Sequence, residues 1–465
     1  MSHPEPHAAL QALSTQLGPE LLLTDDFTRG LYASDDTPRR CMPEGVLFPK
    51  THEQVRDIVA IARQYRVPLV ARGAGSGNVG GALPLPGSLV LSFECMNRIL
   101  DFDPVNRTIT VQAGVITQDI DQLARSQGLF YPPDPGSAPY CRIGGNLAMN
   151  AAGPKAVKYG VTRDYVLALR AITGTGAEIR TGSRTSKGVV GYDLTRLLVG
   201  SEGTLALITE ATLRLLPAPN ARATLRVCFD SNVHACEAVA RVMAGHITPS
   251  ALEFMDHHAI EAIRATGAAS DLPPETRALL MVEADGEASD LPRQIRALEQ
   301  SLQGPGLLEL LEARDPDAIT ALWTARKSLS GAIKRIAPLK INEDVVVPVT
   351  RLAELLAEIE RLTRHYELPI VTFGHAGNGN LHVNLMVHPE DKGEMARARE
   401  ALLQLFKAVL QLGGTLSGEH GIGTEKRDYL PLELDPATLA VMQGIKRQFD
   451  PDGILNPGKA LPMRS

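Results

Sequence analysis

The sequence predicts an α+β protein of two or three domains. The first observation is length, because 465 residues are too many for one compact hydrophobic core. The second is a series of glycine-rich turns that separate strand-like runs from residue 73 to 217. The third is the alternation of strand-like and helix-like segments after residue 218, which is typical of an α+β domain. A domain boundary is expected in "LLPAPNARA", at 215–223.

A helix and a strand are expected before the first glycine-rich loop. In "THEQVRDIVAIARQYRVPLVARG", Thr51 is a candidate N-cap, and Gln54 lies three residues on, as in a capping box. The apolar residues that follow recur at helical spacing, and Pro68 ends this pattern before the strand "LVAR". A shorter amphipathic helix is expected over 10–23.

The region after residue 218 repeats a strand followed by a helix. "TLRVCF" and "RALLMVEADG" are expected strands, and "VHACEAVARVM" and "LPRQIRALEQSL" are the helices that follow them. Two longer helices are expected in "VTRLAELLAEIERLTRHY" and "RAREALLQLFKAVLQLGG", the second of which ends at a glycine pair.

The composition narrows the functional class. Acidic and basic residues are mixed along the chain, and the net charge is −6, so no nucleic-acid partner is expected. The N-terminus lacks a signal peptide pattern, and no apolar run reaches the roughly eighteen residues that a membrane span needs. The five cysteines form no CxxC pair, which indicates a reducing cytoplasm and no thiolate zinc site. The expected location is the cytoplasm, and peripheral attachment to the inner face of the membrane is left open.

The first glycine-rich loop carries a misleading motif. Gly75, Gly77 and Gly80 form G-x-G-x-x-G after a strand, which is the spacing of a dinucleotide fingerprint. That fingerprint must open a helix, and Pro84 and Pro86 exclude one here. The loop is either a backbone nest that binds phosphate or a flexible surface loop. A second stretch from about residue 131 to 176 is rich in glycine but carries few charges, which favours backbone packed against a large flat ligand.

Two histidines flank a glycine-rich turn in "FGHAGNGNLHVN". "PIVTFGH" and "LHVNLMV" are expected to be paired strands, with His382 and Asn384 on one face. Facing Cβ atoms in a hairpin lie about 5 Å apart, so His375 and His382 could bind one metal ion, or both could be solvated. In "SGEHGIG", neighbouring Glu419 and His420 could face one site only if flanking glycines bend the backbone.

These segments together resemble a known family. The similarity runs in order from about residue 43 to 460 and is carried by "RGAGSGNVGGALP", "PPDP", "IGGNLAMNAAGPKAVKYG", "GYDLTRLLVGSEGTLALIT", "GHAGNGNLH", "SGEHGIG" and "FDPDGILNPGK". The sequence resembles the FAD-linked D-2-hydroxy-acid dehydrogenases of the vanillyl-alcohol oxidase superfamily. The resemblance implies a two-subdomain FAD-binding domain of the p-cresol methylhydroxylase type over 1–217. It also implies an α+β substrate (cap) domain with an antiparallel sheet over 218–445, and a segment over 446–465 that returns to the FAD domain.

The resemblance also implies the residues that bind FAD without a covalent link. They are Arg72, Gly73, Ala74, Gly75, Ser76, Asn78, Pro132, Asp134, Ser137, Gly144, Gly145, Asn146, Gly153, Tyr159, Glu202, Gly203, Ile208 and Asn456. Cys141 is the thiol nearest to these loops, and we interpret it as a small buried residue rather than a flavin link.

A metal site and a substrate site follow from the same resemblance. His375, His382 and Glu419 would hold a divalent metal, for which zinc is expected and manganese and iron also fit. His420 would be the catalytic base and contact the substrate, together with Arg326, Ser330, Lys340 and Asn384. Arg326 and Ser330 lie one helical turn apart, and a planar guanidinium suits a carboxylate. One departure is Asn378, where the family usually has an acid.

The implied reaction is oxidation of a D-2-hydroxy acid to the 2-oxo acid, by metal-assisted proton abstraction and hydride transfer to the flavin. D-lactate is the favoured substrate, and D-2-hydroxyglutarate and glycolate are the alternatives. A quinone, a cytochrome or an electron-transfer flavoprotein would accept the electrons, and a homodimer is left open. The competing classes are an oxidase that uses O2, a metallohydrolase built on the His-His-Glu site, and a protein that only carries metal or nucleotide.

Overall fold

The structure is a computed structural model that describes residues 5–185, 187–267 and 271–462. Contacts divide the chain into two compact units. The first comprises residues 1–152, 161–217 and 419–465, and the second comprises 153–160 and 218–418. The second unit therefore ends at residue 418, whereas the substrate domain expected from sequence ends at 445, and the expected domain limits stay predictions.

A small, mostly parallel sheet lies at the start of the first unit. Its strands, in the order β1-β2-β4-β3, are β1 (Leu22–Leu23), β2 (Gly45–Leu47), β4 (Leu89–Ser92) and β3 (Leu69–Arg72). Leu455 forms a parallel bridge with Leu69, so the C-terminal segment lies beside β3. The helices of this part are α1 (Pro6–Leu17), α2 (Asp26–Leu31) and α3 (His52–Gln64).

Helix α3 begins where the sequence predicts. The Thr51 side chain accepts from the Gln54 N–H, and the Gln54 side chain accepts from the Thr51 N–H, which completes the capping box. The apolar face of α3 is buried against α1 and the small sheet. The predicted helix over 10–23 is displaced, because the chain is already in α1 at Pro6 and leaves it at Leu17.

The other sheet of the first unit is antiparallel and has five strands in the order β5-β6-β10-β8-β9. These are β5 (Ile99–Asp103), β6 (Thr108–Gln112), β10 (Ala206–Arg214), β8 (Val166–Thr173) and β9 (Glu178–Gly182). The remaining elements of this unit are α4 (Thr117–Arg125), β7 (Leu129–Phe130), α5 (Ile143–Met149), α7 (Leu194–Leu198), β11 (Leu216–Pro217), α14 (Leu430–Glu433) and α15 (Pro436–Phe449).

The second unit is built on an antiparallel sheet of seven strands in the order β15-β12-β14-β13-β17-β18-β16. The strands are β12 (Ala221–Phe229), β13 (Ala251–Asp256), β14 (Ala278–Gly286), β15 (Leu307–Ala313), β16 (Leu339–Val346), β17 (Ile370–His375) and β18 (Asn380–Val387). The helices are α6 (Ala156–Tyr159), α8 (Asn232–Met243), α9 (His257–Arg264), α10 (Leu291–Leu302), α11 (Pro316–Ala332), α12 (Leu352–Tyr366) and α13 (Lys392–Gln411). The antiparallel sheet predicted for the second half of the chain is thus confirmed.

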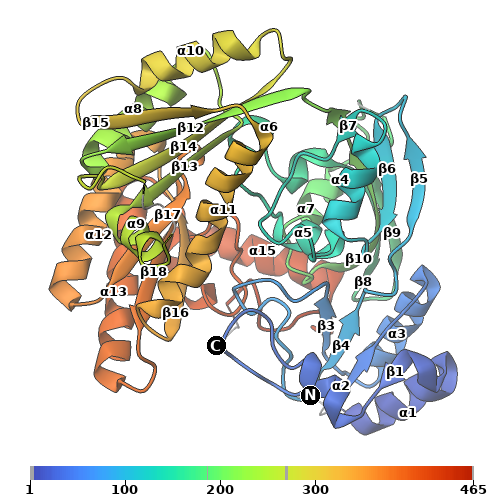
Figure 1. Cartoon of the computed structure of the whole chain (residues 1–465). Coiled ribbons are helices and arrows are strands. Elements are labelled where there is room, and N and C mark those ends of the chain that lie inside the picture. The colour runs from blue at the N-terminus through green and yellow to red at the C-terminus, as the bar shows by residue number, and fades with distance from the viewer. Residues whose placement is uncertain (1–4, 186, 268–270, 463–465) are drawn as a thin grey trace. The chain divides into compact units, whose positions relative to one another are not determined.

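Helices cover both faces of this sheet (Figure 1). Helices α8, α10, α12 and α13 contact one face, whose inward residues include Leu225, Val282 and Val383. Helices α9 and α11 pack on the other face against Met255, Phe373 and neighbouring apolar residues. Because strand side chains alternate between faces, this second face also receives the buried polar residues of β13, β17, β18 and β16.

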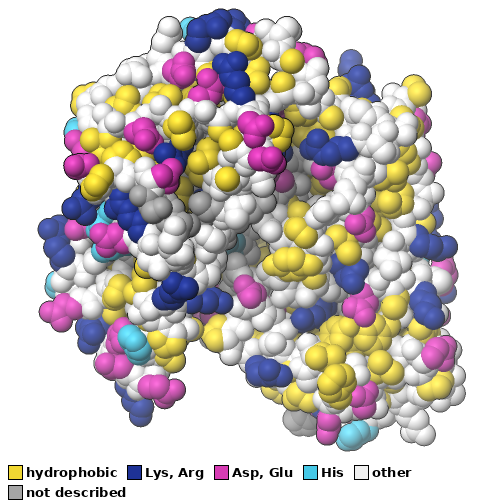
Figure 2. All heavy atoms as spheres, in the orientation of Figure 1, with side chains coloured by type: hydrophobic (Ala, Val, Ile, Leu, Met, Phe, Trp, Pro, Cys, Tyr) yellow, Lys and Arg dark blue, Asp and Glu magenta, His cyan; other side chains and the backbone are white. Residues whose placement is uncertain are grey.

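Surface charge is mixed on the face that Figure 2 shows, where basic and acidic side chains alternate over short distances. Within the described residues, no helix combines the length and the apolar character that crossing a membrane requires.

Candidate functional site

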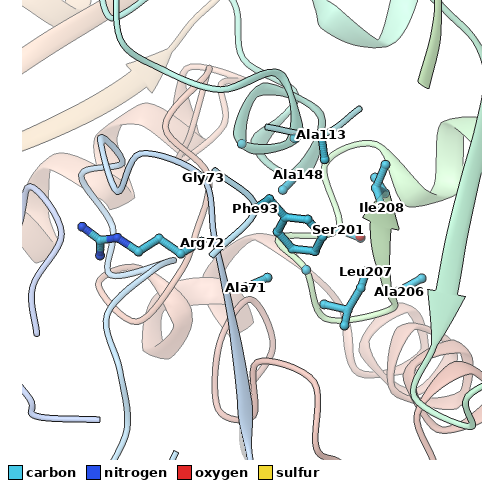
Figure 3. A pocket seen from close by; sticks show the side chains of 13 residues that line it. Ala71, Arg72, Gly73, Phe93, Ala113, Ala148, Ser201, Ala206, Leu207 and Ile208 are labelled. Carbon is cyan, nitrogen blue, oxygen red and sulfur yellow. The ribbon is translucent and has the colours of Figure 1, made fainter. Parts of the chain in front are cut away.

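A cavity in the first unit collects several of the residues expected to bind FAD (Figure 3). It is lined by Ala71, Arg72, Gly73, Phe93, Ala113, Gly144, Gly145, Ala148, Ser201, Gly203, Ala206, Leu207 and Ile208. Most of these side chains are small, so the backbone can lie close to a bound group. Phe93 and the aliphatic residues add an apolar wall, which together with the small residues suits a flat, largely apolar ring.

Two adjacent glycines of α5 have different reasons to be glycine. A Cβ on Gly144 would lie 2.9 Å from the Cβ of Ala113, so packing of the protein itself excludes a side chain there. A Cβ on Gly145 would meet no heavy atom of the described chain within 4 Å. Since Gly145 lines the cavity, its missing side chain keeps space for a ligand rather than for the protein.

Arg72 ends β3 at the edge of this cavity. Its Nη1 donates to the carbonyl of Ser34 at 2.6 Å, and its guanidinium carbon lies 5.3 Å from the ring centre of Tyr32. Burial lowers the pKa of the Arg72 guanidinium. In Figure 3 the side chain extends away from Phe93 and Leu207. A Cβ on Gly75 would collide with this guanidinium, so Arg72 lies directly beneath the first glycine-rich loop.

Glu202 has a role that the sequence did not predict. Its Oε1 accepts from the Ile422 N–H at 2.8 Å, and its Oε2 accepts from the Gly423 N–H at 2.7 Å. Burial raises the pKa of this carboxyl, against the lowering effect of the two backbone donors. Its own carbonyl accepts from Asn456 Nδ2 at 2.7 Å. Glu202 therefore ties the segment after His420 to the C-terminal segment of the same unit.

The other expected FAD residues are more dispersed. Asn146 is buried and donates to Thr117 Oγ1 at 2.7 Å. Tyr159 and Gly153 belong to the second unit, where the Tyr159 hydroxyl donates to Asp285 at 2.8 Å. The remaining ones lie in loops, namely Ala74, Gly75, Ser76 and Asn78 after β3, and Pro132, Asp134 and Ser137 between β7 and α5. Their roles toward FAD stay predictions.

The two glycines that flank Glu419 and His420 in "SGEHGIG" also differ. Gly421 has φ +86°, so the backbone does turn through the left-handed region next to His420. Gly418 needs no such turn, and a Cβ there would lie 2.5 Å from Asn380 Nδ2. The prediction of a bend is confirmed at Gly421, whereas Gly418 is glycine because of close packing. The ligand atoms of Glu419 and His420, both in the first unit, lie within 4.8 Å of each other.

In the second unit, His375 and His382 lie on one face of the sheet but not directly opposite each other. His375 is paired with Asn380, and His382 is paired with Phe373. The expectation of directly facing histidines is therefore corrected to a diagonal pair, because only residues 376–379 separate the two strands. Their ring centres are 5.2 Å apart and their planes are nearly perpendicular, at 85°.

A buried carboxylate on β13 connects two of the predicted residues. Glu253 Oε1 lies 2.5 Å from His375 Nδ1. Its Oε2 accepts from Arg326 Nε at 2.9 Å and forms an ion pair with Arg326 Nη2 at 2.7 Å. Burial alone would raise the pKa of Glu253, but the neighbouring His375 and Arg326 lower it to about 2. Sequence reasoning missed Glu253, although a lone glutamate within the apolar run "ALEFM" is unusual for a buried strand.

Asn384 and Asn342 are paired across β18 and β16. The Nδ2 of Asn384 donates to the carbonyls of Val371 and His382 at 3.0 and 3.1 Å. The amide oxygens of both asparagines are buried and have no hydrogen-bond partner among the described residues. Two acceptors left without donors in the protein are suited to a ligand hydroxyl. Asn342 was not predicted.

The predicted substrate residues of α11 and β16 are also close together. Lys340 Nζ donates to Ser330 Oγ at 3.2 Å, which links β16 to α11. The guanidinium carbon of Arg326 lies 4.7 Å from the ring centre of Phe373. The structure thus places Arg326, Ser330, Lys340 and Asn384 in one unit.

Asp344 is a second acid that the sequence did not reveal. It is buried on β16 directly opposite His382, with Oδ1 4.0 Å from His382 Nδ1. Its Oδ1 accepts from Asn380 Nδ2 at 2.6 Å, and its Oδ2 accepts from the Gly418 N–H at 2.9 Å. A carboxylate therefore stands beside His382 although residue 378 is an asparagine.

The family follows from comparison with known proteins. Residues 43–182 match the FAD binding domain, and residues 218–460 match the C-terminal domain of FAD linked oxidases. The chain belongs to the FAD-linked oxidase family. It is an FAD-dependent oxidoreductase, and the small-residue cavity of the first unit fits that cofactor.

Three relatives of this FAD-linked oxidase match nearly its whole length. Glycolate oxidase subunit GlcD of Bacillus subtilis is 40% identical, covering 95% of this chain and 94% of its own. D-lactate dehydrogenase of Anaerostipes hadrus is 35% identical, covering 94% and 93%. D-2-hydroxyglutarate dehydrogenase of Stutzerimonas stutzeri is 34% identical, covering 97% and 98%.

Solved structures show the fold of the FAD-linked oxidase. p-Cresol methylhydroxylase superposes with a TM-score of 0.82 at 16% identity, covering 98% of this chain and 97% of its own. 4-Ethylphenol oxidase of Gulosibacter chungangensis superposes with a TM-score of 0.76 at 18% identity, covering 100% of both. The predicted fold of the vanillyl-alcohol oxidase and p-cresol methylhydroxylase type is confirmed.

Replacing Gly145 with valine should remove FAD without unfolding the protein. A side chain there meets open space in the chain and fills part of the cavity. We expect the purified variant to lack flavin absorbance after reconstitution with FAD and to keep the circular dichroism of the wild type. The control is Gly30→Val in α2, where a Cβ also meets nothing within 4 Å and which is not among the residues that line this cavity. A yellow Gly145→Val protein would contradict the assignment.

Replacing Glu202 with glutamine should loosen the segment after His420. In the wild type each carboxylate oxygen accepts from one backbone N–H group. Glutamine keeps only one of these oxygens, so one N–H group loses its partner. We expect faster hydrogen exchange in peptides that cover residues 419–425, measured by mass spectrometry. Glu210→Gln serves as the control, since that carboxylate pairs with Arg170 on the five-stranded sheet. Equal exchange in all three proteins would show that Glu202 does not hold this segment.

Proposed function

We propose that this protein oxidises a D-2-hydroxy acid to the 2-oxo acid, with D-lactate as the favoured substrate. D-2-hydroxyglutarate and glycolate are the alternatives. The names of the three relatives support this substrate class, because all act on or are named for short 2-hydroxy acids. The family's FAD-binding match makes the metallohydrolase and the simple carrier less suitable, since neither would use a flavin.

The observation that carries the proposal is the polar face of the seven-stranded sheet. Two buried histidines 5.2 Å apart, a buried amide oxygen without a partner, and two basic side chains meet on it or beside it. A 2-hydroxy acid offers a carboxylate, a hydroxyl donor and a hydroxyl oxygen, so each of its polar groups finds a complementary partner in this set.

Two groups supply chemistry that side chains cannot. When bound, FAD would supply a hydride acceptor, and a divalent metal would supply a Lewis acid. His375, His382 and Glu419 would hold the metal, since two imidazoles and one carboxylate leave an open position for substrate. Zinc is our expectation for the ion, and manganese and iron also suit these ligands.

The protein's own residues bind the substrate and move the proton. Arg326 is the partner for the carboxylate, because its guanidinium can form two parallel hydrogen bonds with it. Lys340 donates to Ser330, and we assign both residues to the same carboxylate-binding region as Arg326. Asn384, whose buried amide oxygen has no partner among the described residues, helps to anchor the 2-hydroxy acid. A ring nitrogen of His420 then takes the hydroxyl proton as Cα loses its hydride.

Asp344 supplies a carboxylate beside His382, which residue 378, an asparagine, does not. It stands opposite His382 and holds Asn380 and Gly418 by hydrogen bonds. A carboxylate at this position supports a ligating histidine from behind the metal site. Metal retention in this chain would therefore depend on Asp344.

The electrons would leave the flavin for a quinone, a cytochrome or an electron-transfer flavoprotein. An oxidase that uses O2 is the alternative within flavoproteins. Reoxidation of the reduced protein by air in a stopped-flow instrument separates the two, because an oxidase reoxidises at the rate of turnover. Attachment to the inner face of a membrane and a homodimeric assembly remain expectations from sequence.

Replacing His420 with alanine should leave the flavin bound and slow its reduction. Without the base, the hydroxyl proton has no acceptor in the site, which costs at least ~100-fold in rate. We would mix the variant anaerobically with D-lactate, D-2-hydroxyglutarate or glycolate and follow the loss of flavin absorbance. The wild type should bleach fastest with D-lactate. A variant that bleaches at the wild-type rate would remove His420 from the mechanism.

Replacing Arg326 with lysine should weaken substrate binding more than turnover. Lysine keeps the charge but cannot form the paired hydrogen bonds of a guanidinium, so KM should rise by about tenfold. The matched control is Arg335→Lys, because Arg335 is exposed just beyond α11 and donates only to the carbonyl of Ala265 among the bonds recorded for it. Equal KM values in both variants would argue against carboxylate binding by Arg326.

A further inference from the structure

We propose that Glu253 is a shared positioning residue that orients the metal ligand His375 with one carboxylate oxygen and the substrate-binding Arg326 with the other. The inference rests on the proposed function and deepens it. Glu253 lies in β13, outside every motif noted in the sequence. We assign to it the orientation of both a metal-binding and a substrate-binding side chain.

Each oxygen of Glu253 is committed to a different partner. The carboxylate is fully buried, with Oε1 at 2.5 Å from His375 Nδ1. Oε2 accepts from Arg326 Nε and pairs with the charge on Nη2 at 2.7 Å. The three residues come from β13, β17 and α11, which are far apart in sequence. A single side chain therefore fixes the separation between a histidine of the hairpin and an arginine of the helix above it.

The fold itself does not require a charge at this position. Two same-face neighbours of Glu253 are apolar, because Met255 follows it two residues on in β13 and Met281 is its partner on β14. A buried ion pair is weak evidence for stability, because apolar residues of similar size often replace one without loss. The contacts of Glu253 are better explained by what they orient.

For His375, the contact decides which ring nitrogen is available. A carboxylate oxygen accepts a hydrogen bond, so the proton lies on Nδ1, and Nε2 keeps its lone pair for a metal ion. Ligating histidines commonly donate their other ring N–H to such an acceptor, which fixes both tautomer and ring orientation. The diagonal packing against His382 adds a second constraint on the ring.

For Arg326, the contact occupies one edge of the guanidinium. Nε donates to Oε2, and Nη2 lies 2.7 Å from the same oxygen, so the edge between the two Nη atoms remains for a carboxylate. The ring of Phe373 lies 4.7 Å from the guanidinium carbon and restricts rotation of the group. Arg326 is thereby pre-oriented, which lowers the entropy lost when a substrate binds.

Glutamine at residue 253 tests whether Glu253 orients His375 and Arg326 or only fills space. The amide has the same shape but an oxygen on one side and an NH2 group on the other, so it cannot accept from both His375 Nδ1–H and Arg326. We expect Glu253→Gln to bind Zn2+ about 10- to 100-fold more weakly, measured by competition with a chromophoric chelator. The KM for D-lactate should also rise about tenfold at saturating Zn2+.

Glu283→Gln is the matched control. Glu283 is buried on the same face of the next strand, β14, and accepts from Trp323 Nε1 at 3.0 Å and from Thr224. It reaches α11 as Glu253 does, but none of its recorded contacts is with His375 or Arg326. If the substitutions only loosened α11, both variants would lose Zn2+ affinity equally and both would show the same rise in KM. That result would defeat the proposal.

A readout without metal or substrate completes the test. The full-length protein, labelled with 15N-histidine and stripped of metal, should show His375 as the Nδ1–H tautomer, with the resonance assigned by its loss in His375→Gln. Glu283→Gln should keep that tautomer, and Glu253→Gln should change it. A wild-type His375 protonated on Nε2 would overturn the proposal even if the variant did not fold. Absence of flavin reduction by any 2-hydroxy acid would instead defeat the proposed function alone.

Discussion

The two-residue alternation of side chains along β13, β17, β18 and β16 is the constraint on which the site depends. These strands are neighbours in one antiparallel sheet, so alternate residues of all four reach the same face. That face gathers Glu253, Asp344, His375, His382 and Asn384, whose sequence positions span more than a quarter of the chain. A slip of one residue in any strand would send its polar groups to the opposite face, under α12 and α13.

Burial of this polar face has a second consequence. Charged side chains buried beneath α11 need partners within the protein. Glu253 contacts both His375 and Arg326. Asp344 lies beside His382 and accepts from the Gly418 N–H. Such contacts restrict each side chain to one orientation before any ligand arrives. In the first unit the buried carboxylate of Glu202 has a comparable role, but its partners are the backbone N–H groups of Ile422 and Gly423 rather than side chains.

Sequence reasoning succeeded where the signal is local. The capping box at Thr51, the strand pair around the glycine-rich turn and the absence of a helix after Gly80 all follow from residues close together in the chain. It failed where the partner comes from another element. Glu253 and Asp344 lie in strands without a motif, and only the sheet order brings them to His375 and His382. The register of the hairpin was also misjudged, because the pairing of His375 with Asn380 depends on a tight turn whose length the sequence does not specify. Gly418 shows the same limit, since its packing partner Asn380 is remote in sequence.

Anomalous X-ray diffraction from crystals of the flavin-loaded protein grown with Zn2+ tests the central claim most directly. The account predicts one strong anomalous peak about 2.0–2.1 Å from Nε2 of both His375 and His382, with a carboxylate oxygen of Glu419 as a further ligand. A peak bound elsewhere, or two imidazoles with their Nε2 atoms turned toward solvent and no ion between them, would contradict it.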